Sequence, residues 1–137
     1  MKTEHETPDF FKEMFGWNYF ADGYLELVID FDYSRYFKHD QLDEAIKLAT
    51  GAITNGREVY FGPAIREKDL GSKRSDIKNI LGSRCIWVDI DPPDKTMSPE
   101  EQREQVEGQL QSALTRLNVY RLEPTFIVSS GNGYHLY

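Results

Sequence analysis

The second half of the chain alternates between short apolar stretches and one long helical pattern. Apolar runs at 84–91 and 124–129 predict two strands, and a glycine turn leads from the second run into an alternating stretch at 134–137. A helix start lies between the two runs, where Ser98 can cap the helix and Pro99 takes its first position. The apolar stripe of this helix is Val106, Leu110, Ala113, Leu114 and Leu117. Strand, helix and strand in this order predict a right-handed crossover with both strands in one sheet.

The first half predicts a further set of helices and strands. It comprises a helix over 7–15 that Gly16 ends, a strand over 24–30, an amphipathic helix over 38–53 with Asp40 as its cap, and a strand over 57–62 after an Asn55-Gly56 turn. Residues 64–83 are expected to form a basic loop, with one or two helical turns between Ser75 and Leu81. Together, these elements indicate an α+β fold.

Composition narrows the class of protein and its compartment. The chain has 137 residues, enough for one domain with a real core, and its 39% apolar and 13% aromatic content excludes disorder. No apolar run approaches the ~20 residues that span a bilayer, and the N-terminus has no signal-peptide pattern. Cys85 is the only cysteine, which excludes a disulfide framework or a cysteine metal site and predicts a small core residue. These features favour a soluble, cytoplasmic protein.

The net charge of −7 is unevenly distributed along the chain. Residues 1–56 carry 5 basic and 11 acidic side chains, residues 57–84 carry 7 and 4, and residues 85–137 carry 4 and 8. The positive middle segment leads directly into a pair of aspartates. It is either a local anion-binding surface on an acidic protein or a solvated loop with scattered lysines and arginines.

That aspartate pair, Asp89 and Asp91, ends the apolar run Cys85-Ile86-Trp87-Val88. Residues two apart on a strand point to the same face, so the two carboxylates project side by side while Val88 and Ile90 face the core. Like charges this close repel each other, and a divalent metal between them relieves the repulsion. The pattern therefore predicts a metal site at the end of a strand.

Two features of the first half could also bind a metal or a nucleic acid, but each has a simpler structural interpretation. Asp30 and Asp32 form a second D-x-D, which we interpret as a surface or capping feature because a Tyr-Ser-Arg-Tyr stretch follows it. The aromatic cluster at 15–20 (Phe15, Trp17, Tyr19 and Phe20) offers faces on which bases could stack, but we favour the interpretation that it packs in the core.

The turn before the last predicted strand carries the second candidate site. Gly131-Asn132-Gly133 permits positive φ, and backbone N–H groups of such a turn can point at an anion. His135 alternates with Leu136 and so faces the opposite side from it. If this hairpin neighbours the Asp89 strand, His135 faces the same site as the aspartate pair.

These two motifs resemble those of the archaeo-eukaryotic primase superfamily. The run 85–91 looks like its first motif, an apolar strand ending in D-x-D or D-x-E. The run 130–137 (Ser-Gly-Asn-Gly-Tyr-His-Leu-Tyr) is similar to its second motif, in the Ser-Gly-x-Gly-x-His-x-Tyr form of the primase-polymerases of phages, plasmids and mobile elements. Val59-Tyr60-Phe61-Gly62 followed by Arg66 is similar to a short strand and arginine that often lie upstream. The resemblance covers roughly 57–137, and no motif is identified in 1–56.

The resemblance implies an RRM-like mixed sheet after an N-terminal α/β portion, and a DNA primase or polymerase activity. Two Mg²⁺ or Mn²⁺ ions would be held by Asp89 and Asp91, and His135 would contact the phosphates of a dNTP or NTP. Further nucleotide or template contacts are expected from Ser130, Gly131, Gly133, Arg66, Lys73 and Arg74. The implied partners are a single-stranded or primed DNA template and a helicase or replication initiator.

The chain departs from the family pattern in two places. The superfamily has a third motif beyond the histidine, an apolar residue followed by Asp, which this chain does not contain. We therefore expect 1–137 to be a C-terminally truncated catalytic domain and to be inactive by itself. The strict Ser-x-His form of the second motif is also not met, because Gly133 stands two residues before His135.

Two other function classes remain open at this point. D-x-D at a strand end also occurs in other metal-dependent phosphoryl or glycosyl transferases. A non-catalytic nucleic-acid-binding or replication-initiator module could keep the same fold. Incorporation of nucleotides on a primed template would distinguish a polymerase from both.

Overall fold

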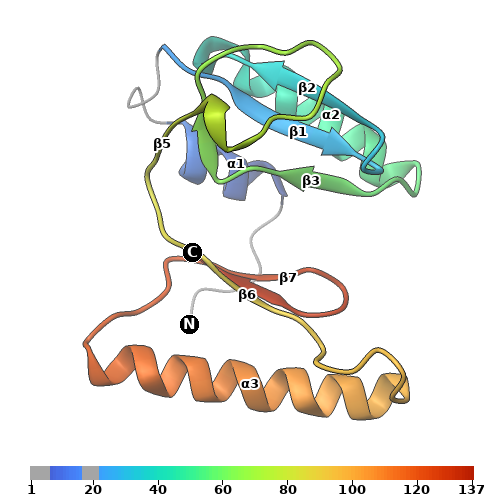
Figure 1. Cartoon of the computed structure of the whole chain (residues 1–137), viewed down its shortest axis with the longest axis vertical. Helices are drawn as coiled ribbons and strands as arrows, with labels where there is room; N and C mark the ends of the chain where they lie inside the picture. Colours follow the sequence, from blue (N-terminus) through green and yellow to red (C-terminus); the bar gives the residue numbers. More distant parts are fainter. Residues whose placement is uncertain (1–6, 17–21) are drawn as a thin grey trace. The chain divides into compact units, whose positions relative to one another are not determined.

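The protein has an α+β fold that divides into two compact units, with the division after Cys85. The computed structural model describes residues 7–16 and 22–137. The first unit combines helices with small antiparallel sheets, and the second combines one helix with one antiparallel sheet, as Figure 1 shows. The predicted α+β class is confirmed. A strand that follows residue 56 belongs to the sheet of the first unit.

The first unit is built on a three-stranded sheet in the order β2-β1-β3. Its strands are β1 (Leu25–Ile29), β2 (Tyr33–Phe37) and β3 (Val59–Phe61), and both pairings are antiparallel. Sequence reasoning predicted β1 and β3 but missed β2. The stretch Asp30-Phe31-Asp32 is the turn of the β1–β2 hairpin, with φ of 51° at Asp30 and 56° at Phe31.

The second D-x-D is thus a turn feature, as its surface interpretation expected. The Asp30 carboxylate accepts hydrogen bonds from Arg57 Nε at 2.7 Å and from the Glu58 backbone N–H at 2.8 Å. These bonds to the ionised form hold the pKa of Asp30 below its usual range, with the Arg57 hydrogen bond as the largest cause. Asp30 therefore ties the hairpin turn to the start of β3.

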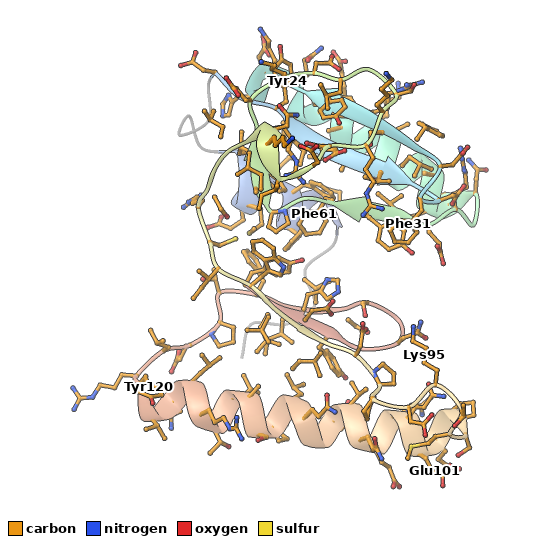
Figure 2. The ribbon with its side chains drawn as sticks, in the orientation of Figure 1. Tyr24, Phe31, Phe61, Lys95, Glu101 and Tyr120 are labelled. Carbon is orange, nitrogen blue, oxygen red and sulfur yellow. The ribbon has the colours of Figure 1, made fainter. Side chains whose placement is uncertain are left out.

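Two helices contribute to the apolar core of this unit. They are α1 (Thr7–Phe15) and α2 (Leu42–Thr54), the latter preceded by a 3₁₀ turn, η2 (His39–Gln41). Phe10, Phe11 and Phe15 of α1 surround Phe61 of β3 at ring-centroid distances of 5.2–5.9 Å (Figure 2). Phe15 is thus a core residue, as the packing interpretation expected, while Trp17, Tyr19 and Phe20 lie outside the described residues.

The predicted cap of the second helix is wrong in position. Asp40 lies inside η2, and the residue that precedes α2 is Gln41. The Gln41 side chain turns back to accept the backbone N–H of Lys38 at 3.0 Å. The expected Asn55-Gly56 turn ends the helix, and Gly56 takes the positive φ of 72° that such a turn requires.

The basic loop has more structure than the sequence predicted. It contains β4 (Ala64–Arg66) paired with β5 (Ile80–Ser83), and a single 3₁₀ turn, η3 (Ile77–Asn79). The expected helical turns are therefore confined to three residues. The segment between β4 and η3 is fixed to the sheet by Glu26 of β1, a carboxylate that is only 2% exposed.

Glu26 is hydrogen-bonded through both oxygens. One oxygen accepts from Ser34 Oγ at 2.8 Å, Tyr36 OH at 3.0 Å and the backbone N–H of Ser75 at 2.8 Å. The other accepts from Arg66 Nε at 2.9 Å. Tyr36 OH also donates to the Lys73 carbonyl at 2.7 Å. These hydrogen bonds compensate the buried carboxylate for its lost hydration. Because Arg66 and Ser75 belong to the basic loop, their bonds to Glu26 hold this loop against the sheet.

The second unit is a three-stranded antiparallel sheet with one long helix. The sheet has the order β6-β8-β7, with β6 (Val88–Ile90), β7 (Ile127–Ser129) and β8 (Tyr134–Leu136). The helix α3 (Pro99–Val119) lies along this sheet, as Figure 1 shows. The prediction that the strands before and after the helix share one sheet is confirmed. They run parallel to each other, with the hairpin strand β8 inserted between them.

Helix α3 begins and packs as its sequence predicts. Ser98 caps it in a capping box with Glu101, in which each side chain bonds to the other residue's backbone N–H, and Pro99 takes the first position. The core of the unit is formed by Val106 and Leu110 of α3 with Ile90 and Leu136 of the sheet. Ala113, Leu114 and Leu117 complete the predicted stripe at its edge.

The apolar run before Asp89 is the main disagreement in this unit. A buried strand was expected over 84–91, but β6 spans only Val88–Ile90. Ile86 is 83% exposed, and Trp87 and Val88 are also exposed; only Ile90 lies in the core. Cys85 is half-buried outside the strand and is not the core residue that was predicted. No helix in the described part of the chain is long and apolar enough to cross a bilayer.

Candidate functional site

The two faces of the β6-β8-β7 sheet differ in chemistry. The face against α3 carries the apolar residues Ile90 and Leu136. On the opposite face, the strand register places Asp89 directly across from His135, and His135 directly across from Val128. Because alternate residues share a face, Asp91 and Gly133 follow Asp89 and His135 in the next row. This face is called the carboxylate face below.

The central contact of the carboxylate face joins Asp89 and His135. His135 Nε2 lies 3.3 Å from Asp89 Oδ1, and their side chains are 32% and 55% exposed. On the other side of the ring, Nδ1 lies 3.3 Å from the Tyr137 hydroxyl. A carboxylate accepts hydrogen bonds, so it favours a proton on Nε2 and leaves Nδ1 of the neutral ring to accept from Tyr137. The imidazole is therefore oriented from both nitrogens.

Asp91 lies just beyond the end of β6 and is exposed. Among the described residues, none forms a hydrogen bond or an ion pair with its carboxylate. Exposed, weakly paired carboxylates are suitable ligands for hard divalent cations. The described residues contain no group of three or more His, Cys, Asp or Glu side chains placed to hold an ion. Two carboxylates still fit Mg²⁺, which is commonly held by one or two of them together with substrate phosphates and water.

Gly133 is required by the close approach of two strands. A Cβ at this position would collide with the carbonyl oxygen of Ile90 and would lie 3.3 Å from Asp91 Cα. Only glycine therefore lets the start of β8 pass this close to the end of β6. The glycine motif and the D-x-D motif are thus coupled sterically. This contact fixes the aspartate pair beside the strand that carries His135.

The glycine turn is closed by its own serine. Ser130 Oγ accepts the Gly133 N–H at 3.1 Å, and the Ser130 N–H donates to the Gly133 carbonyl at 2.9 Å. Gly131 takes a φ of 95°, as the predicted turn requires. The Gly133 N–H is therefore used inside the turn. The expected nucleotide contacts of Ser130, Gly131 and Gly133 stay predictions, and their observed role is to shape the turn.

A hydrogen bond on the helix side supports the same strand. Tyr134 OH donates to Glu107 of α3, and this bond raises the pKa of Tyr134. Tyr134 pairs with Ile90 in the register and precedes His135. The bond therefore ties β8 to α3 immediately beside the histidine.

The three basic candidates lie in the first unit. Arg66 is engaged by Glu26, and its side chain is 14% exposed. Lys73 is exposed, and its carbonyl accepts the Tyr36 hydroxyl. The Arg74 guanidinium lies 5.1 Å from the ring centroid of Phe31 in the hairpin turn. The observed partners of all three residues belong to their own unit, and their predicted template or triphosphate contacts stay predictions.

Sequence reasoning did not assign a role to Tyr137 or Trp87. Tyr137 is placed by backbone hydrogen bonds with Phe126, in which the Tyr137 N–H donates at 2.9 Å and its carbonyl accepts at 3.2 Å. Trp87 precedes β6 and is 47% exposed. The two-residue alternation of side chains along a strand could have placed both residues on the carboxylate face. Trp87 is two residues from Asp89, and Tyr137 is two residues from His135.

No family model, no curated protein and no solved structure matches this chain.

Proposed function

We propose that this chain is the metal-binding catalytic part of a template-directed nucleotidyltransferase, a DNA primase or polymerase similar to the archaeo-eukaryotic primase superfamily. One observation carries the proposal. Asp89 of the D-x-D motif and His135 of the glycine–histidine motif are direct cross-strand neighbours, 3.3 Å apart, on one exposed face. Two motifs far apart in the sequence thus meet on one face of the sheet. A triphosphate and its cations could bind there together.

The two carboxylates define what this face can bind. Asp89 and Asp91 would repel a bare triphosphate, so an anionic substrate requires cations between it and the pair. These two residues would hold Mg²⁺ or Mn²⁺. When bound, two such ions activate a 3′-hydroxyl and neutralise the triphosphate and the leaving pyrophosphate.

His135 has a role that does not depend on where the ions sit. Its Nε2 lies beside Asp89, and with Nδ1 accepting from Tyr137 the Nε2–H can donate to a phosphate oxygen. Gly133 lets β8 approach the end of β6 closely enough for this donor to lie beside the carboxylates. A dNTP or NTP and a single-stranded or primed DNA template are the substrates of this proposal, and a helicase or replication initiator is the partner that the family resemblance suggests.

The test is primer extension by the full-length protein with Mg²⁺ or Mn²⁺. We expect Asp89→Ala to reduce incorporation by at least about 100-fold, because the ligand that faces His135 is lost. Asp32→Ala is the matched control, since it removes an exposed aspartate of the other D-x-D and should leave incorporation unchanged. Normal extension by Asp89→Ala would rule out this function.

Two other outcomes would favour the alternatives. Binding of single-stranded DNA without synthesis, unaffected by Asp89→Ala, would indicate a nucleic-acid-binding or initiator module. Loss of hydrolysis of another phosphoester in Asp89→Ala, with no nucleotide incorporation by the wild type, would indicate a different metal-dependent transferase.

A further inference from the structure

The carboxylate face continues past the Asp89–His135 pair into a row of aromatic residues. The backbone hydrogen bonds between Tyr137 and Phe126 extend the pairing of β8 with β7 by one step beyond Leu136. On the other side of β8, β6 pairs Val88 with Leu136, so the next pair along would be Trp87 and Tyr137. Because alternate residues of a strand share a face, Trp87 then lies on the same face as Asp89. The row is therefore Trp87, Tyr137 and Phe126, next to the row of Asp89, His135 and Val128.

Trp87 is the member of this row with the most accessible ring. Its side chain is 47% exposed, although a tryptophan in a folded domain is usually largely buried. The Tyr137 ring is already used, because it packs edge-on to His135 at 6.2 Å and its hydroxyl meets Nδ1. An exposed indole beside a charged site is a surface on which another flat group can stack.

We propose that Trp87 is the base-stacking side of the nucleotide site, so that the substrate lies along β6 with its phosphates at Asp89, Asp91 and His135 and its base on the indole. This inference rests on the proposed function and deepens it. Two residues along a strand span roughly 7 Å. A ribose provides a separation of this order between the α-phosphate and the base, so one nucleotide can contact both rows.

Stacking also predicts that the site does not distinguish one base from another. Every base has a π-face, so an indole binds all four without reading their edges. That property suits a template-directed enzyme, in which the template selects the base. Trp87 would therefore contribute affinity and orientation to every incoming nucleotide about equally.

The experiment compares two ligands in the full-length protein with Mg²⁺: a dNTP, and inorganic tripolyphosphate, which has the phosphates but no base. We expect Trp87→Leu to weaken dNTP binding by about 5- to 150-fold, the range of one stacked base, and to leave tripolyphosphate binding within about twofold of the wild type. Trp87→Phe should recover most of the loss. Ile86→Ser is the matched control, because Ile86 is 83% exposed and adjacent but has the opposite alternation.

A second readout does not depend on the folding of a variant. The emission of Trp87, taken as the difference between wild type and Trp87→Phe, should be quenched by the dNTP and not by tripolyphosphate. Equal effects of Trp87→Leu on both ligands, or no quenching by a bound dNTP, would overturn the stacking role while leaving the proposed function standing. If tripolyphosphate binds Asp89→Asn as tightly as it binds the wild type, it is the proposed function that fails.

Discussion

Two acidic side chains on sheet strands, Glu26 and Asp89, have opposite surroundings in this protein. Glu26 is 2% exposed and accepts four hydrogen bonds from four residues. The Asp89 side chain is 55% exposed, and His135 is its one ion-pair partner among the described residues. A buried carboxylate must have its donors within the fold, whereas an exposed one keeps oxygens free for a ligand. The comparison predicts that Glu26 stabilises the fold and that Asp89 is available to bind a ligand.

The largest expected effect is the loss of stability in Glu26→Ala. The substitution leaves the Arg66 charge, the Ser34 hydroxyl and the Ser75 N–H without their acceptor. Removing one partner of a buried ion pair costs about 3–5 kcal/mol. We expect a drop of about 4 kcal/mol in the free energy of unfolding of the first unit, measured by denaturant unfolding.

Glu58→Ala is the control for this change. Glu58 is exposed, and its side chain accepts from Tyr60 OH at 2.7 Å at the edge of the same sheet. We expect less than about 0.5 kcal/mol from its loss. If both variants lost a similar amount of unfolding free energy, burial would not distinguish carboxylates that stabilise this fold from carboxylates that are free to bind a ligand.

A somewhat smaller effect is expected from pH, through Tyr36. Burial and the hydrogen bond to Glu26 raise the pKa of Tyr36 from 10.0 to about 12. Below pH 10 the hydroxyl is protonated in both states, so its contribution to stability is fully present. Between pH 10 and 12 the unfolded chain loses the proton and the folded chain keeps it, so the free energy of unfolding falls by about 3 kcal/mol.

The measurement is the difference between wild type and Tyr36→Phe in unfolding free energy from pH 9 to 12. The difference cancels the lysines and other tyrosines that titrate in this range. We expect the wild type to lose stability more steeply than the variant. Parallel curves would mean that the hydroxyl is not buried against Glu26.

The sequence was most informative where one pattern decides one element. The Ser98 cap and the apolar stripe of α3 are both local, and both are confirmed. The alternation around His135 predicted its face, and the register places it opposite Asp89 as expected. These predictions succeed because periodicity and caps depend on neighbours in the chain.

What the sequence did not reveal depends on contacts between distant residues. β2 was missed because Tyr33–Phe37 becomes a strand by pairing with β1. Glu26 reads as one acid within an apolar strand, and its donors come from positions up to 49 residues away. The steric need for Gly133 arises from the Ile90 carbonyl, which a turn pattern does not reveal. The hydrophobicity of the run at 86–88 predicts burial, yet all three residues are exposed in the structure.

The smallest expected effect, on the stability of Asp89→Asn, is the sharpest test of the comparison. The ion pair with His135 is solvent-exposed, and such pairs contribute about 0–1 kcal/mol. The substitution also removes a charge next to Asp91, which relieves repulsion between the two carboxylates. The two effects oppose each other, so we expect a net change within about 0.5 kcal/mol in denaturant unfolding. A loss above about 2 kcal/mol would place Asp89 with Glu26 as a structural carboxylate. An unchanged stability together with lost nucleotide incorporation would instead separate folding from function at a single oxygen-to-nitrogen exchange.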